Sequence, residues 1–182
     1  MMPTIICDSR EQKWDHVRAY FDRCGLKWIR SKLPIGDYGR LDNLSIVIDR
    51  KAHLSEVENN LIQQHDRFRA ECIRAKENGI KLIILVEAGR SIKTLSDVAG
   101  WENPRMARWQ ELNFAHAMGK RLKEKCSPQP PTDGKRLMQI MTTMQEKYGI
   151  EWRFCSSMNA GREICKILGI DPALAQGVVV GE

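Results

Sequence analysis

The apolar run at residues 80–87, Ile-Lys-Leu-Ile-Ile-Leu-Val-Glu, constrains the fold more than any other segment of this chain. The run is short, rich in β-branched side chains, and follows Gly79. A strand with apolar side chains on both faces is buried on both faces, which requires helices on each side of the sheet. The run therefore predicts a central strand in a sheet that is covered on both faces.

Strand and helix patterns alternate along the rest of the chain. Short runs of strand-forming residues cover 4–7, 27–30, 45–51 and 150–155. Apolar residues at helical spacing cover 14–24, 54–78, 105–125, 137–148 and 160–168. This interleaving predicts an α/β fold around a mixed central sheet. Because the chain has 182 residues and no internal repeat, we expect one domain over residues 1–169 and a C-terminal tail over 170–182. In the long helix predicted over 54–78, His65 falls on the apolar face, which favours a core position over a role at a site.

Basic residues outnumber acidic ones. Lys and Arg number 29 against 23 Asp and Glu, a formal net charge of +6. This excess favours a polyanionic partner, although many enzymes carry a similar charge. The excess is concentrated between residues 120 and 136, where the predicted contacts to DNA phosphates are Lys120, Arg121, Lys123, Lys135 and Arg136. A solvated basic helix end explains the same window, and both interpretations stay open.

Several classes of protein are disfavoured. No apolar run approaches the roughly 20 residues that a membrane helix needs, and the N-terminal segment is charged too soon for a signal peptide. We therefore expect a cytoplasmic protein with no membrane partner. The six cysteines lack metal-ligand spacing and are expected to be free thiols. Only three residues separate Gly89 from Lys93, too few for a phosphate-binding loop, so no nucleotide cofactor is expected.

The spacing of Asp37, Asp49 and Lys51 indicates chemistry. Side chains in a strand alternate between faces, so Asp49 and Lys51 share one face, roughly 7 Å apart, and Arg50 points to the other. A hairpin that places Asp37 beside Asp49 brings two carboxylates together, which favours a divalent cation. With a neighbouring Lys, such a site suits phosphodiester hydrolysis. A hairpin with ordinary charged residues at its ends is the structural alternative.

Two further carboxylates, Asp8 and Glu11, follow the first predicted strand. Open α/β sheets bind their ligands at the carboxyl ends of strands, so these residues are candidates for the same site. Asp8 also suits a helix cap.

Three motifs in order resemble the nuclease domain of the XPF family. They are Asp8-Ser9-Arg10-Glu11, Leu33-Pro34-Ile35-Gly36-Asp37-Tyr38 and Val47-Ile48-Asp49-Arg50-Lys51. The resemblance covers roughly the first 90 residues, and the second half is similar to stand-alone nucleases of phages and bacteria. It implies a restriction-endonuclease-like fold, in which a mixed central sheet is flanked by helices.

The resemblance also implies a function. It indicates a DNA endonuclease that uses Mg²⁺ or Mn²⁺, acts on DNA in repair or recombination, and forms a homodimer as one option; selectivity for branched or forked DNA is left open. Asp37 and Asp49 would be the principal metal ligands, with Asp8 and Glu11 completing or supporting the acidic cluster. Lys51 would be the catalytic ammonium. Arg50 and Arg10 would each pair with a carboxylate or a DNA phosphate.

The sequence departs from the family pattern at two positions. Asp49 stands where the family has Glu, and Ser55 stands where the family has a later acidic residue, with Glu56 next to it. The tandem helix-hairpin-helix module of many relatives is not evident. A catalytically weak or inactive protein that binds DNA or assists assembly on a nuclease scaffold is therefore the alternative hypothesis.

Overall fold

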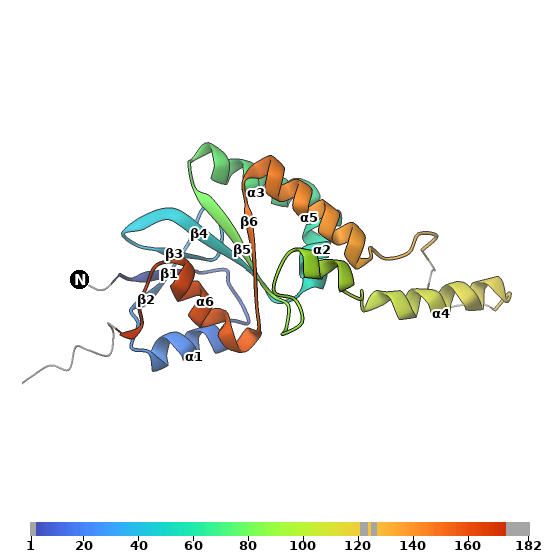
Figure 1. Ribbon diagram of the computed structural model, residues 1–182, viewed down its shortest axis with the longest axis horizontal. Helices are drawn as coiled ribbons and strands as arrows, with labels where there is room; N and C mark the ends of the chain where they lie inside the picture. Colours follow the sequence, from blue (N-terminus) through green and yellow to red (C-terminus); the bar gives the residue numbers. More distant parts are fainter. Residues whose placement is uncertain (1–2, 121–123, 125–126, 174–182) are drawn as a thin grey trace, which may run out of the picture.

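The computed structural model describes residues 3–120, 124 and 127–173. In this part of the chain a six-stranded sheet runs in the order β2-β1-β3-β4-β5-β6 (Figure 1). The strands are β1 (Ile5–Asp8), β2 (Trp28–Ser31), β3 (Tyr38–Arg40), β4 (Asn43–Lys51), β5 (Lys81–Glu87) and β6 (Glu151–Cys155). β3 is antiparallel to both of its neighbours, and the other neighbouring pairs are parallel.

Helices cover both faces of the sheet (Figure 1). The helices and 3₁₀ turns are α1 (Asp15–Arg23), α2 (Leu54–Ile62), α3 (His65–Glu77), η1 (Ser96–Gly100), α4 (Arg105–Ala117), α5 (Gly134–Tyr148), η2 (Ser157–Asn159) and α6 (Ala160–Ile167). α1 and α6 pack on one face around Ile48 and Leu85, and α2, α3 and α5 pack on the other around Ile84 and Val86. The predicted α/β class, with a mixed central sheet flanked by helices, is confirmed.

The directions of the strands place several charged side chains at one edge of the sheet. β1, β2, β4, β5 and β6 all run in the same direction, because β3 alone is reversed among the described strands. Their carboxyl ends therefore lie along one edge, and β3 begins at that same edge. Asp8, Asp37, Lys51 and Glu87 all stand there.

The helix expected over 54–78 is two helices, so that prediction was wrong. α2 ends at Ile62 and α3 begins at His65. Residues 62–67 are all exposed, whereas Leu61 and Phe68 on either side are buried. The break turns this stretch away from the sheet, and His65 is exposed rather than in the core. No glycine or proline marks the break in the sequence.

The helix expected over 105–125 is also shorter than predicted. α4 ends at Ala117, and Gly119 adopts a left-handed conformation with φ of 71°. The backbone N–H of Lys120 donates to the carbonyl of Ala115, and that of Gly119 donates to His116. Such a pair of bonds closes a helix end and needs a residue that tolerates positive φ, which glycine does.

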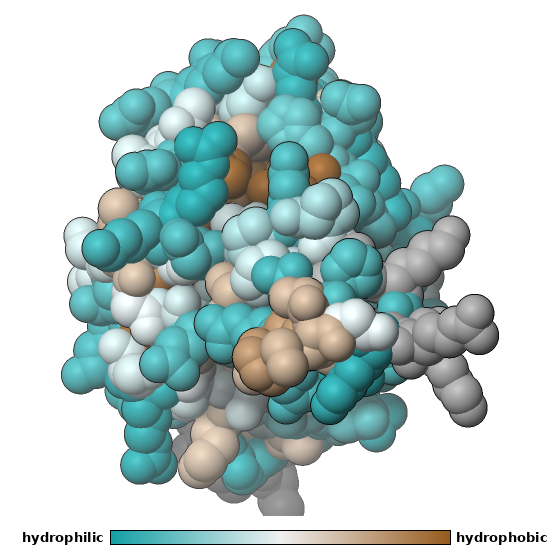
Figure 2. All heavy atoms as spheres, turned by 90° about the vertical axis from the view of Figure 1, so that its right-hand side faces the viewer, coloured by the Kyte–Doolittle hydropathy of each residue, from teal (hydrophilic) through white to brown (hydrophobic). Residues whose placement is uncertain are grey.

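α4 projects from the body of the molecule (Figure 1). None of its residues is buried, and Phe114 and Met118 are 69% and 64% exposed. Figure 2 faces this end and shows a small hydrophobic patch among hydrophilic side chains. Arg105, in the first turn, forms an ion pair with the buried Glu58 of α2. The helix is thus anchored at its start.

The described cysteines, at positions 7, 24, 72, 155 and 165, are free thiols, as predicted, and all five are buried. Cys126 lies outside the described residues. No helix in the described part is long and apolar enough to span a bilayer. Of the expected tail, Ile170 is buried against the α1–α6 face, and residues from 174 onward lie outside the described part.

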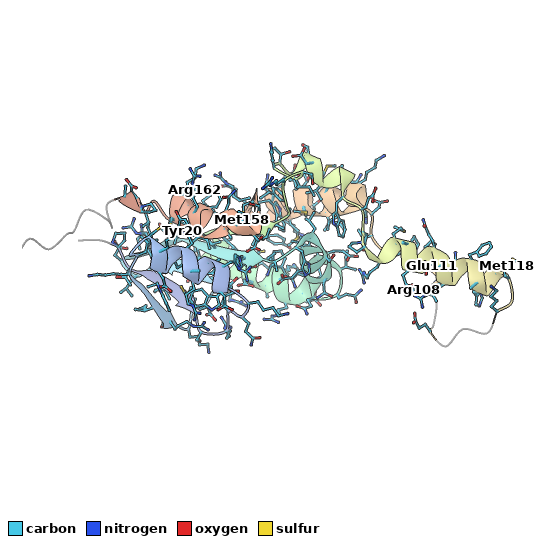
Figure 3. All side chains as sticks on the ribbon, turned by 90° about the horizontal axis from the view of Figure 1, so that it is seen from below. Tyr20, Arg108, Glu111, Met118, Met158 and Arg162 are labelled. Carbon is cyan, nitrogen blue, oxygen red and sulfur yellow. The ribbon has the colours of Figure 1, made fainter. Side chains whose placement is uncertain are left out.

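Gly161 allows α6 to approach α1 closely. A Cβ at this position would lie 2.7 Å from the Cβ of Tyr20 and 2.8 Å from its ring carbon Cγ. Figure 3 shows Tyr20 of α1 close to Arg162 of α6 at this contact. The Cβ of Tyr20 is fixed to its backbone, so the helices themselves must separate to admit a side chain.

We expect Gly161→Ala to lower the free energy of unfolding by about 1–3 kcal/mol, the usual cost of overpacking. This outweighs the gain of about 0.5–1 kcal/mol that alanine brings to a helix interior. Urea unfolding measures the change. Gly100→Ala is the control, because a Cβ there meets no atom within 4 Å. Equal stability of the two variants would contradict the close contact.

Candidate active site

Gly36 and Asp37 are fixed between β1 and β4. Gly36 has φ of 67°, and a Cβ there would lie 2.8 Å from the carbonyl oxygen of Ile48. The backbone N–H of Asp37 donates to that same oxygen at 2.7 Å, and the carbonyl of Asp37 accepts from the N–H of Asp8 at 2.7 Å. The N–H of Gly36 donates to Glu71 of α3 at 3.0 Å. Only glycine fits here, and it delivers the carboxylate of Asp37 to the edge of the sheet.

Asp37 and Asp49 form the electrostatic centre of this edge. One oxygen of Asp37, Oδ2, accepts from the backbone N–H of Arg50 at 2.8 Å. Burial raises the pKa of Asp37 well above its usual range, and the carboxylates of Asp49 and Glu11 raise it further. Asp49 is 5% exposed, and its Oδ2 is buried with no hydrogen-bond partner among the described residues. The hairpin therefore brings the two carboxylates into mutual repulsion, as the sequence predicts.

Lys51 neutralises part of this charge. Its Nζ lies 2.8 Å from Oδ1 of Asp49, on the same face of β4. Burial acts to lower the pKa of Lys51, but the carboxylates of Asp49, Asp37 and Glu56 together outweigh it and raise that pKa above its usual value. The neighbouring carboxylates thus favour the ammonium form of Lys51.

Arg50 points to the opposite face, as predicted from strand alternation. Its side chain is 4% exposed and donates to Glu11 at 2.6 Å and to Glu87 of β5 at 2.7 Å. Glu87 also contacts His16 of α1 at 2.7 Å. Arg50 therefore pairs with carboxylates and faces no open surface.

Glu87 and His16 are site residues that the sequence reasoning missed. Glu87 ends the buried strand, so an acidic residue at the carboxyl end of the most apolar run was an available signal. The sequence carries no signal that Glu87 pairs with Arg50. The two residues meet only through the parallel register of β4 and β5, in which Arg50 lies opposite Leu85. No pattern in the sequence singles out His16.

The carboxylate of Asp8 has hydrogen-bond partners of its own, which differ from those of Asp37 and Asp49. It is fully buried and accepts from the N–H of Leu33 at 2.6 Å and from Arg10 through both backbone and guanidinium. Burial acts to raise the pKa of Asp8, but the hydrogen bonds from Arg10 and Leu33 outweigh it and lower that pKa. Asp8 thus orders the turn after β1, and Arg10 pairs with a carboxylate, one of the two partners expected for it.

Glu56 lies beside the site, and Ser55 does not replace the missing acid. The side chain of Glu56 accepts from the N–H of Ala52 at 2.8 Å, and its own N–H donates to His53, which together close the start of α2. The charge of Glu56 also contributes to raising the pKa of Lys51. Glu56, next to Ser55 at the family's later acidic position, therefore contributes to the electrostatics of the site.

The predicted DNA contacts outside Arg10 lie apart from this cluster. Lys120 follows α4 and is exposed, and Lys135 and Arg136 are exposed in the first turn of α5. None of these three side chains contacts the carboxylates described above. Arg121 and Lys123 lie outside the described residues.

The pair of Asp37 and Asp49 fits a divalent cation. Among the described residues no group of three or more His, Cys, Asp or Glu side chains is arranged to hold a metal. However, the buried Oδ2 of Asp49 is an anionic oxygen with no partner in the described part of the chain, which is costly unless a cation binds it. Mg²⁺ commonly binds through one or two carboxylates, with water and substrate phosphates completing its shell.

Comparisons with known proteins concern the family and the fold of this chain. The family model of the ERCC4 domain matches residues 7–166. The structure of XPF from Aeropyrum pernix is similar, with a TM-score of 0.59 and 19% identity over 97% of this chain and 67% of that chain. XPF from Aeropyrum pernix in complex with DNA gives a TM-score of 0.58 and 20% identity over 99% and 68%. No curated protein matches the sequence. The solved structures show that the fold is shared.

The first prediction from this site concerns Arg50. We expect Arg50→Ala to lower the free energy of unfolding by about 3–5 kcal/mol, because Glu11 and Glu87 then remain buried without a counter-charge. Urea unfolding at pH 7 measures this loss. Arg18→Ala is the control, since Arg18 pairs with Asp15 on the surface and such pairs contribute about 0–1 kcal/mol. A loss below 1 kcal/mol for Arg50→Ala would rule out the bridging role.

The second prediction concerns Asp37 and pH. Because its folded pKa is raised, the protonated form is favoured, and its contribution to stability is full below the unfolded pKa of about 3.9 and is lost as pH rises through the folded pKa. In EDTA, Asp37→Asn should therefore be more stable than the wild type at pH 7, and this difference should shrink toward pH 4.

Denaturant midpoints at the two pH values test this. Asp42→Asn is the matched control, because a hydrogen bond from Arg40 lowers the pKa of Asp42 and the substitution should not stabilise the protein at pH 7. An Asp37→Asn variant that is less stable than the wild type at pH 7 would show that repulsion does not dominate at this position.

Proposed function

The chain belongs to the ERCC4 domain family of XPF-like nucleases, and from that membership we propose that it is a metal-dependent endonuclease that hydrolyses phosphodiester bonds in DNA. The observation that carries this proposal is the carboxylate of Asp49, which has a buried oxygen without a partner in the described residues and an ammonium 2.8 Å from its other oxygen. A buried anion in this state is suited to a cation that itself contacts phosphate.

Asp37 and Asp49 would hold Mg²⁺ or Mn²⁺. When bound, such a cation polarises the scissile phosphate and lowers the pKa of water. Asp37 is oriented for this by the N–H of Arg50, which fixes one of its oxygens. We assign supporting roles to Asp8 and Glu11, because their carboxylates already accept hydrogen bonds from Arg10 and Arg50.

Lys51 would stabilise the negative charge that develops on the phosphate during hydrolysis. Its Nζ is held by Asp49, and its raised pKa keeps it charged. A fixed cation that is already in place needs no reorganisation as the reaction proceeds, which is the main source of electrostatic catalysis. Arg50 would act through position: its side chain holds the loop after β1 and the end of β5 in register with β4.

The proposal also covers the residues that contact DNA, the structure of the DNA and the oligomeric state. A net charge of +6 supports a DNA partner, with Lys120, Lys135 and Arg136 as the described basic residues that would contact phosphates. Selectivity for branched or forked DNA and a role in repair or recombination are implied by the family alone. A homodimer would use Phe114 of α4 and Met118 just after it, which are exposed among the described residues.

The alternative is a catalytically weak or inactive DNA-binding protein on this scaffold. It is favoured by the engagement of Asp8 and Glu11 with arginines, which leaves no three-ligand metal group among the described residues. A binding protein would be indifferent to the presence of divalent cations, whereas the proposed nuclease would not.

We expect the wild type to cut DNA in Mg²⁺ or Mn²⁺ and not in EDTA, and Lys51→Ala and Asp49→Asn each to reduce cleavage at least about a hundredfold, the scale for loss of one electrostatic stabiliser. Cleavage of labelled duplex, forked and single-stranded DNA measures this, and anisotropy measures binding. Lys27→Ala is the control, because Lys27 is exposed and precedes β2 at the opposite edge of the sheet. Intact DNA in every reaction, with binding retained, would favour the alternative.

A further inference from the structure

We propose that the cavity beside Lys51, between α2 and α3, binds the base of one unpaired nucleotide next to the scissile phosphate. This inference rests on the proposed nuclease function and names the class of DNA that the site accepts. The preferred substrate would carry an unpaired nucleotide at the position of cleavage.

The cavity is small. Its volume is about 270 Å³, just below the roughly 300–1,000 Å³ typical of small-molecule sites. It owes its existence to the break between α2 and α3, which separates Asn59 and Asn60 of α2 from Arg67 of α3. A continuous helix would have no such recess.

The lining of the cavity matches the edge of a base better than a phosphate. Asn59, Asn60 and Gln64 each present an amide with both donors and an acceptor. Amides and carboxylates read the edges of bases, since an amide can both donate and accept and a carboxylate accepts from an amino group. Glu56 and Glu71 also line the cavity and offset the charges of Lys51 and Arg67, so the lining has no excess of positive charge for a phosphate.

Several of these groups are available for a ligand. Within the described residues Asn59 and Arg67 make no side-chain hydrogen bond or ion pair, and both are exposed. The amides of Asn60 and Gln64 share a single hydrogen bond of 3.3 Å. The guanidinium of Arg67 can stack on a base or donate to its edge, which are both common in recognition of unstacked bases.

Lys51 joins the cavity to the reaction centre. It lines the cavity and its Nζ lies 2.8 Å from Asp49. A base in the cavity would therefore place an adjoining phosphate at the carboxylates. Removing a base from a duplex costs a few kcal/mol and costs least where the base is already unpaired. The cavity would thus favour strands that are unpaired at the cut.

The experiment scans one abasic residue along the unpaired strand of a forked DNA. Affinity is measured by anisotropy in Ca²⁺, so that binding is read separately from cleavage. We expect the wild type to lose about tenfold in affinity when the abasic residue occupies one position, in line with the stacking energy of a single base, and we expect that position to adjoin the cut made in Mg²⁺.

The double variant Asn59→Ala/Arg67→Ala identifies the cavity. We expect it to bind the intact fork about tenfold more weakly than the wild type does, and to show no further loss with the abasic fork. Gln63→Ala/Arg74→Ala is the matched control, because it removes the same number of charges from exposed positions of the same segment that do not line the cavity. The control should behave as the wild type. Thermal melting should be unchanged in both variants.

Three results would overturn the inference. The first is an abasic scan of the wild type without a sensitive position, which needs no variant. The second is an equal loss of affinity for intact and abasic DNA in the cavity variant, which would indicate phosphate contacts. The third is unchanged binding by that variant. If the wild type cuts no DNA but shows the expected base dependence, the nuclease function fails and the base site stands; cleavage without base dependence gives the reverse.

Discussion

The guanidinium of Arg50 is the interaction on which the edge of the sheet depends. It bridges Glu11, in the loop after β1, and Glu87, at the end of β5, while its own backbone lies in β4. Its backbone N–H simultaneously fixes one oxygen of Asp37. One residue thus holds the segment after β1, the approach to β3 and the end of β5 in place around β4. Asp49 and Lys51 project from the other face because successive side chains of a strand alternate between its two faces.

The charges at the centre of the site lower the stability of the folded protein. Asp37 and Asp49 repel each other in a region where burial already disfavours charge, and one oxygen of Asp49 has no partner in the described chain. Buried anions of this kind persist only where the surrounding structure holds them. Here Gly36 and the backbones of β1 and β4 do so. A cation bound by the two carboxylates would reduce this repulsion.

The sequence could predict those features of the site that depend on neighbouring residues. It could not predict those that depend on residues far apart in the chain. The opposite orientation of Asp49 and Arg50 follows from the two-residue period of a strand, so it was predictable and is confirmed. The partners of Arg50 were not, because Glu87 reaches it only through the register of two strands separated by α2 and α3. Likewise, the hydrogen bond from Leu33 to Asp8 depends on the course of a loop. The break at residues 63–64 was missed because the sequence has no helix-breaking residue there.

We expect α4 to have a lower local stability than the sheet. Its first turn is anchored by Arg105 and Glu58, and none of its residues is buried among the described part of the chain. The side chains of Arg108 and Trp109 contact Glu124 and Ser127 beyond the helix. A helix of 13 residues that buries none of its side chains is marginal in water. Its backbone amides will therefore exchange hydrogen with solvent through local opening, whereas those of β5 exchange only when the whole sheet opens. We therefore expect α4 beyond its first turn to open separately from the cooperative unit that contains the sheet, so that substitutions at its exposed positions alter the surface more than the global unfolding transition.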